Sequence, residues 1–205
     1  MIRTLRRYWK SKQGMAAVEF AFVLPILVTM LLGLVELSQA MLIRSDVSNM
    51  ASVGANLIAE EKSVTSTDIT NVFNAVGAML FPFNLTTPDP AHPGQQLNIY
   101  SVTLTSVVDG GASGSPRVAW SCTQYGTAES KGGAPSKALP NGPDGTPMIT
   151  PGDGTSVIWA RVTYKYTSPL SYFMTGSRTW TNDFYLKPRR VLQVPVTGSP
   201  AGCNT

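Results

Sequence analysis

The chain has 205 residues, and its formal net charge of +4 comes from its first few residues. The remaining 11 Lys and Arg residues face 12 Asp and Glu, so residue 14 onward carries a net charge of −1. A nucleic-acid-binding domain needs a basic face on its folded part. The composition therefore argues against that class and assigns the positive charge to a leader. The five leader cations are Arg3, Arg6, Arg7, Lys10 and Lys12.

An apolar run follows the leader, from Met15 to Val35, and its only charge is Glu19. As a helix this run is about 31 Å long, enough to cross the apolar core of a bilayer. The uncharged part, Phe20 to Val35, is about 24 Å long and also fits the core of a signal peptide. Because the basic flank comes first, the positive-inside rule places residues 1–14 in the cytoplasm and the bulk of the chain on the far side.

Two residues inside this run need an explanation. An acid in a membrane helix costs about 2.5–3.5 kcal/mol. Glu19 therefore either lies at the interface and reaches the headgroups, or meets a positive group on another chain or at a mature amino terminus. Pro25 removes the hydrogen bond to the Ala21 carbonyl and is expected to kink or open the helix. Membrane helices also tolerate proline, so this second reading of Pro25 stays open.

These residues together resemble a known pattern. Gly14 is followed by Glu19 and Phe20, then by Pro25 in the apolar run, and finally by Gly33 and Glu36. Over about residues 13–45 the chain resembles the TadE-like family, which are minor pilins or pseudopilins of the tight-adherence (Tad/Flp) type IV pilus system. The combination is specific, although each of its members alone is a weak signal.

The resemblance implies a role for each of these positions. Type IV prepilins are cut after a glycine by an aspartyl prepilin peptidase in the inner membrane. Here the cut would follow Gly14 and make Met15 the first mature residue. Glu19 would then pair with the amino terminus of a neighbouring subunit, and Phe20 matches the aromatic residue that follows the glutamate in Tad pilins. Such pairing is physically reasonable, because a carboxylate among apolar helices is costly without a cation nearby.

Helical periodicity continues beyond Glu36. Apolar residues recur every three or four positions up to Ala59, which predicts one helix from about Ala16 to Ala59 or two helices joined near Glu36. The apolar stripe docks either on the chain's own domain or on neighbouring pilin helices. A second helix, capped by Ser66 or Thr67 and with Asp68 in its first turn, extends to about Leu80.

Strands are predicted after this helix. The ranges 97–108, 116–122, 156–166 and 180–194 are rich in β-branched and aromatic residues. The last range is expected to form one strand or a hairpin, and Pro188 marks a break in it. The first two are expected to pair antiparallel. Residues 84–96 and 124–153 are predicted to be loops, the second with little to bury. A helix or turn is expected at 168–173. The fold class is therefore α+β and pilin-like: a long N-terminal helix, a short second helix and a small antiparallel sheet of three to five strands.

The sequence divides into a leader (1–14), a transmembrane helix (15–36), a helix extension (37–62) and a periplasmic or extracellular α+β domain (63–205). Cys122 and Cys203 are the only cysteines. In an oxidising periplasm they are expected to form a disulfide, and two free thiols are the alternative. The loop enclosed gives a chain-entropy stabilisation of about 4.5 kcal/mol.

Catalytic chemistry is not indicated. The only histidine, His92, lies in a proline-rich stretch, so neither a histidine-based triad nor a zinc site has the residues it needs. We therefore expect no enzyme, cofactor, metal or small-molecule substrate. The expected partners are the membrane, other Tad pilus subunits, assembly proteins and a prepilin peptidase.

Two rival interpretations place the chain elsewhere. Ser38-Gln39-Ala40 has the small-x-small pattern of a signal peptidase site, and cutting there would release a soluble domain that starts at Met41. Glu36 and the amphipathic pattern across this site argue against it. Alternatively, the chain is an uncut single-pass scaffold that stays in the inner membrane during pilus assembly.

Overall fold

The structure, a computed structural model, describes residues 15–83, 85–88, 91, 93, 96–111, 114–168 and 174–205. The leader with Gly14, the loop histidine His92 and most of the 168–173 stretch lie outside these residues. The chain divides into two compact units. The helix unit comprises Met1–Met41 and Thr167–Ser177, and the sheet unit comprises Leu42–Tyr166 and Arg178–Thr205.

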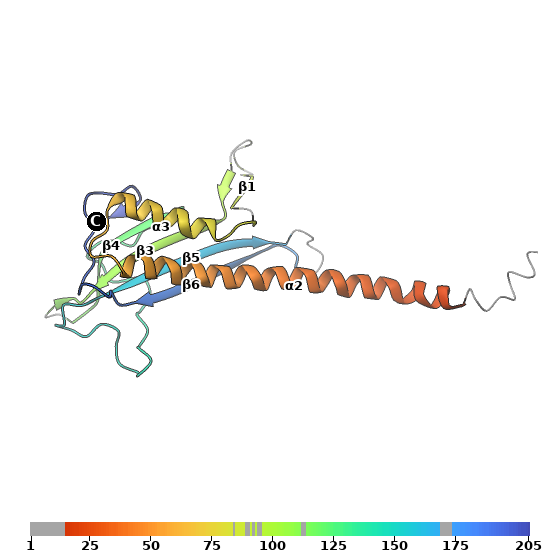
Figure 1. The fold of residues 1–205 in the computed structure, drawn as a ribbon, viewed down its shortest axis with the longest axis horizontal. Coiled ribbons are helices and arrows are strands. Elements are labelled where there is room, and N and C mark those ends of the chain that lie inside the picture. Colours follow the sequence, from red (N-terminus) through yellow and green to blue (C-terminus); the bar gives the residue numbers. More distant parts are fainter. Residues whose placement is uncertain are drawn as a thin grey trace, which may run out of the picture. The chain divides into compact units, whose positions relative to one another are not determined.

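Helix α2 (Met15–Ala59) is one uninterrupted helix, as the first of the two sequence interpretations predicts (Figure 1). Its part in the sheet unit is amphipathic, and the apolar stripe is buried in the chain's own domain. Leu57, which the pattern assigns to this stripe, is 37% exposed. The buried members of the stripe are Ile43, Val47, Met50, Ala51, Ala55, Ile58 and Ala59.

Helix α3 (Ser66–Ala78) begins one residue earlier than the sequence indicates. Its N-cap is Thr65, whereas the pattern predicts Ser66 or Thr67. Thr65 and Asp68 form a capping box: the Thr65 hydroxyl accepts from the Asp68 N–H at 3.3 Å, and the Asp68 carboxylate accepts from the Thr65 N–H at 2.9 Å. The N–H groups of the first turn have no acceptor inside the helix, so the Thr65 hydroxyl supplies one.

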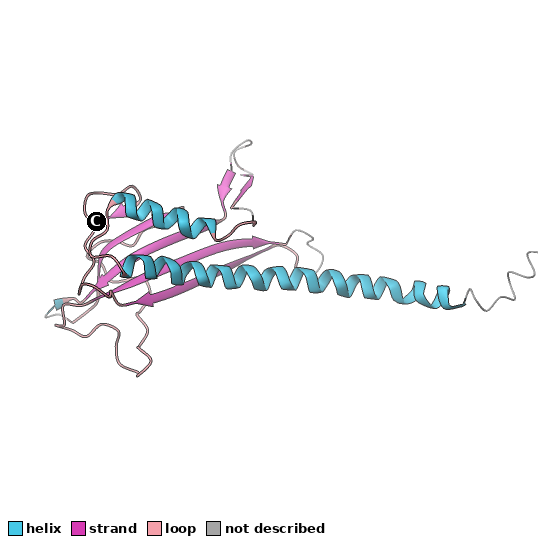
Figure 2. Ribbon diagram, viewed as in Figure 1, coloured by secondary structure: helices cyan, strands magenta, loops and turns pink. Residues whose placement is uncertain are grey.

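The main sheet is antiparallel and has five strands in the order β6-β5-β3-β4-β7. Figure 2 draws the strands as magenta arrows. The predicted pairing of the first two long strands is confirmed: Leu104 lies opposite Cys122, and on its other side opposite Ala160. The observed fold is thus α+β, as predicted. The strands are β3 (Tyr100–Val108), β4 (Arg117–Gln124), β5 (Ser156–Thr167), β6 (Ser177–Leu186) and β7 (Cys203–Asn204).

Three predicted segments differ from the structure. The stretch 84–96 is not simply a loop, because β1 (Thr86–Pro88) pairs antiparallel with β2 (Gln96–Asn98) in a separate hairpin. The predicted strand over 97–108 is accordingly two strands, divided at Ile99. The last predicted segment, 180–194, contains no hairpin: the single strand β6 (Ser177–Leu186) begins three residues before it and ends before Pro188.

Helices cover one face of the sheet within the sheet unit (Figure 1). A Cβ atom on Gly54 of α2 would lie 3.4 Å from Leu104 of β3 and 3.5 Å from Val76 of α3, so the three elements meet at this small residue. Gly77 of α3 approaches the sheet even more closely, because a Cβ atom there would lie 2.9 Å from the Tyr100 hydroxyl. These glycines allow the two helices to pack directly on β3.

The long segment between β4 and β5 covers the other face. The prediction that this loop has little to bury is wrong. Ile149 is 6% exposed and packs with Val107, Val157 and Trp159, with Leu139 and Met148 against the same cluster. A few apolar residues in this Gly- and Pro-rich stretch cover the core on this face. Their spacing has no regular period, so the sequence pattern does not predict their burial.

The C-terminal segment is tied to β4. Cys203 lies opposite Cys122 in the β4–β7 register, and the two residues form a disulfide. Cys122 is fully buried. The bridge therefore fixes the end of the chain to an edge of the sheet core across a sequence separation of 81 residues.

Removing this bridge with Cys122→Ala and Cys203→Ala is expected to lower the free energy of unfolding by about 2–4 kcal/mol, because the unfolded chain regains the entropy of the open loop. Urea unfolding of the double variant and of the parent, each with and without reductant, measures the effect. A parent whose unfolding midpoint does not respond to reductant would contradict it.

Candidate functional site

The N-terminal part of α2 exposes apolar side chains all round. The exposed fraction is 58% at Phe20, 76% at Phe22 and 61% at Leu31. The most apolar 18-residue stretch of this helix has none of its residues buried. A helix that is apolar on every side needs apolar surroundings. In length and composition this segment is a candidate membrane span, and among the described residues nothing covers it.

The residues that the family pattern assigns to assembly all lie on this exposed segment. Glu19 is exposed and is not part of any ion pair among the described residues. Pro25 lies inside α2, and the Thr29 hydroxyl donates to the Pro25 carbonyl oxygen one turn away. Met15 is the first described residue and is 62% exposed. The structure thus presents Glu19, Phe20 and Pro25 outward, where another molecule can reach them.

Glu36 at the other end of the apolar run is buried, with 1% of its surface exposed. The Ser168 hydroxyl donates to its Oε1 at 2.9 Å, and the Met174 N–H donates to its Oε2 at 3.0 Å. Hydrogen bonds to both oxygens offset much of the cost of removing a carboxylate from water. Glu36 therefore anchors the segment between β5 and β6 to α2 within the helix unit.

The family pattern includes Glu36, but the sequence does not predict its hydrogen bonds to the segment between β5 and β6. The sequence signal for a role of Glu36 is its position as an acid at the end of an apolar run. Its partners lie 132 and 138 residues further along the chain, and local patterns carry no information about them. Next to Glu36, an apolar groove of about 450 Å³ is lined by Met30, Gly33, Leu34, Leu37 and Met174.

The sheet unit has its own polar cluster on the loop-covered face. Asp183 of β6 accepts from Lys137 at 2.6 Å, from Trp159 at 2.8 Å and from Arg161 at 2.8 Å. The Arg161 guanidinium lies over the Trp159 ring, 4.4 Å from its centroid. Lys137 belongs to the long loop, so the cluster joins that loop to β5 and β6.

Asp183 is held in its charged form. Burial acts to raise the pKa of this carboxyl group, but hydrogen bonds from Lys137, Arg161 and Trp159 and the charge of Arg161 outweigh burial and lower it. Its neighbour Tyr185 stacks on Trp159, and burial, together with the charge of Asp183, raises the pKa of Tyr185 to about 12. A carboxylate with its donors already in place is suited to hold structure rather than to accept a proton in catalysis.

No group of three His, Cys, Asp or Glu residues that could hold a metal ion is found in the described part of the chain.

The predicted site residues fall into two sets. Met15, Glu19, Phe20 and Pro25 lie on the exposed apolar helix, and Cys122 and Cys203 are joined in the sheet unit.

The comparison with protein families bears on the first set. The family model for TadE-like proteins matches residues 14–56. Over these residues the chain is similar to TadE-like proteins. The match begins at Gly14, contains Glu19, Phe20, Pro25 and Glu36, and ends in the buried stripe of α2, so it covers the whole exposed helix. Searches of curated proteins and of solved structures found no match. TadE-like proteins are structural components associated with Tad pili, and the similarity in this chain is to residues 14–56.

The role of Glu36 is tested by Glu36→Ala. Loss of a hydrogen bond to a charged acceptor is expected to speed amide hydrogen exchange at Met174 by about tenfold or more. Ser38→Ala, which removes an exposed hydroxyl bonded to the Val35 carbonyl, is the matched control and should leave Met174 unchanged. Equal exchange in all three proteins would show that Glu36 does not hold this segment.

The Asp183 cluster predicts a pH dependence. Because the folded state lowers the pKa of this carboxyl group, its contribution is complete above the unfolded pKa and is lost as the pH falls through the folded pKa. Asp183→Asn should lower the free energy of unfolding at pH 7 by about 1–3 kcal/mol. Lys137 contributes little to this figure, because solvent screens its exposed ammonium group. The variant should also lose less stability than the parent below about pH 4, the ordinary range of an aspartate.

Urea unfolding at pH 7 and pH 3 measures both effects, with Asp153→Asn in an exposed loop turn as the control. An Asp183→Asn protein that loses as much stability on acidification as the parent would contradict this account.

Proposed function

We propose that this chain is a minor pilin or pseudopilin-type component of Tad/Flp pilus assembly, inserted in the bacterial inner membrane through the N-terminal part of α2. In this role it supports pilus biogenesis and adhesion. Its N-terminus lies in the cytoplasm and its sheet unit in the periplasm. Its partners are other Tad pilus subunits, assembly proteins and the prepilin peptidase.

The exposed apolar helix carries this proposal. Residues 15–35 have no covering element within the described chain, and the TadE-like match extends over all of them. A soluble protein rarely exposes such a large continuous apolar surface, which marks a membrane or protein contact. A membrane meets the requirement before assembly, and neighbouring pilin helices meet it afterwards.

In this proposal the leader is temporary, because the peptidase removes it. Cleavage after Gly14 removes the five leader cations and leaves a chain whose formal charge is −1. It also creates a positive amino group at Met15, four residues before Glu19. That amino group on one chain and Glu19 on the next form a charge pair between parallel helices that are shifted by about one helical turn. Glu19 thus sets the register of assembly.

The size of the sheet unit supports a minor role. Most of the chain lies beyond the apolar helix, whereas a major Flp pilin is very short and almost entirely helical. A chain with a disulfide-bonded α+β domain is therefore better suited to initiate a filament or to stand at its tip than to form its bulk.

The structure also bears on the rival interpretation of secretion. Ala40, the last residue before the alternative cut, is 5% exposed and lies within an unbroken helix. Proteases prefer exposed and flexible segments. This geometry disfavours release of a soluble domain at Met41. An uncut inner-membrane scaffold is the remaining alternative, and it shares the same exposed helix.

Replacement of Glu19 tests the proposal. Glu19→Ala should leave the amount of protein in the membrane fraction unchanged or higher, because the variant removes an acid from the apolar run. Pilus yield should fall by about tenfold or more, the factor that corresponds to 1.4 kcal/mol. Glu19→Asp keeps the charge and should restore part of the yield.

Glu61→Gln, an exposed acid just beyond α2, is the control for loss of one negative charge and should leave pilus yield normal. Full piliation with Glu19→Ala would exclude the proposed pairing. Absence of the parent chain from the membrane fraction would exclude the proposed anchor.

A further inference from the structure

Most of the strongly exposed large apolar side chains of the sheet unit are near one end of it. Exposed fractions are 58% at Leu42, 85% at Phe81, 47% at Leu97 and 53% at Tyr125. Leu97 precedes β3, Tyr125 follows β4, and Phe81 follows α3. By contrast, Leu192, which is 66% exposed, lies at the opposite end, where its carbonyl oxygen accepts from the N–H of Ser156 at the start of β5.

Contacts within the sheet unit define the shared end. Tyr100, the first residue of β3, lies opposite Tyr164 near the end of β5, and Gly77 near the end of α3 lies against Tyr100. The Tyr125 ring packs edge-on against Tyr100 with the centroids 5.3 Å apart. We name this the tyrosine end of the sheet unit.

Helix α2 enters the sheet unit at the tyrosine end. Arg44 lies over the Trp180 ring at 5.7 Å, and the adjacent Thr181 contacts Thr163 of β5 at 3.1 Å. At the other end of the helix, the Ala59 carbonyl oxygen accepts from the Arg189 N–H, beyond the last residue of β6. Leu42 is therefore at the same end of the unit as Tyr100.

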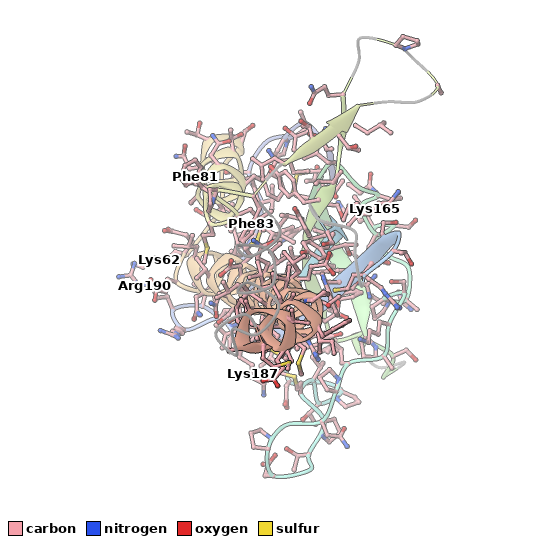
Figure 3. The ribbon with its side chains drawn as sticks, turned by 90° about the vertical axis from the view of Figure 1, so that its right-hand side faces the viewer. Lys62, Phe81, Phe83, Lys165, Lys187 and Arg190 are labelled. Carbon is pink, nitrogen blue, oxygen red and sulfur yellow. A yellow bond between two sulfur atoms is a disulfide. The ribbon has the colours of Figure 1, made fainter. Side chains whose placement is uncertain are left out.

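Exposed cations also lie at the tyrosine end. Arg44 on α2, Lys165 on β5 and Arg178 on β6 are all exposed. Among the described residues of α2, the acid near Arg44 in sequence is Asp46, which is partly buried. Figure 3 looks from this side and shows Phe81 by α3 and Lys165 across the sheet.

We propose that the tyrosine end rests on the membrane surface, with Phe81 in the headgroup region and Arg44, Lys165 and Arg178 facing anionic lipid headgroups. This inference rests on the proposed membrane anchor. Six residues, about 9 Å of helix, separate Glu36 from Leu42, so the tether keeps this end near the bilayer at any angle between the two units. Aromatic side chains with nearby cations are typical of the membrane interface.

A lipid surface fits these side chains better than a protein partner does. The apolar groups here stand on separate turns and strands, the cations stand on α2, β5 and β6, and the described pockets do not join the apolar groups into one groove. A stable protein interface has a continuous apolar centre from which charges are depleted. Interfacial lipid accommodates isolated aromatic and basic groups and needs no complementary shape.

The test places an environment-sensitive fluorophore on single cysteines in the full chain. Phe81→Cys reports on the tyrosine end, Leu192→Cys on the opposite end and Leu27→Cys on the apolar helix. The native cysteines are occupied by their disulfide. Each labelled protein is reconstituted at low density in vesicles of phosphatidylethanolamine and phosphatidylglycerol, with and without a lipid that carries a nitroxide quencher near its headgroup.

Quenching at position 81 should exceed quenching at position 192 at least threefold, with a blue-shifted emission at 81 and a water-like emission at 192. Equal, water-like emission at both positions while position 27 is quenched would overturn this inference and leave the anchor intact. A water-like signal at position 27 would instead overturn the anchor of the proposed function. A blue-shifted but unquenched label at 81 would indicate a protein contact and also overturn the inference.

The cationic part has its own control. Lys165→Glu with Arg178→Glu should reduce quenching at position 81 in the anionic vesicles and change it little in phosphatidylcholine vesicles. Unchanged quenching in the anionic vesicles would overturn the role of these cations. Circular dichroism of each variant confirms that the exposed substitutions leave the fold intact.

Discussion

The rest of the structure depends on one constraint: the first half of α2 exposes apolar side chains on every side, and no other part of the described chain covers it. A helix of this kind is stable only where lipid or other helices replace water around it. The second half of the same helix has only one apolar stripe, and that stripe closes the core of the sheet unit. One element therefore serves two environments, and the change from one to the other follows Glu36.

The two acids of the apolar segment have opposite environments. Glu19 is exposed where apolar surroundings are required, so its charge calls for a partner outside the chain. Glu36 is buried and has its donors within the helix unit, from Ser168 and Met174. We infer that the first acid serves assembly between chains, whereas the second serves the chain's own structure.

Sequence patterns predicted the elements whose signals are local. These include the long helix, the second helix, the antiparallel pairing of β3 with β4, and an α+β class. They missed what depends on distant residues. The partners of Glu36, the Asp183 cluster and the cover that Ile149 provides all join segments without a shared period. The capping error at Thr65 arose because three adjacent residues can each serve as a cap.

In this account the apolar helix anchors the chain in the membrane, and after cleavage behind Gly14 it packs with neighbouring subunits during assembly. Mass spectrometry of the intact chain, extracted from the membrane fraction of its native host, tests both parts at once. The account predicts a membrane-bound chain that begins at Met15 and retains the Cys122–Cys203 disulfide. A membrane-bound chain that begins at Met1, or a soluble chain that begins at Met41, would contradict it.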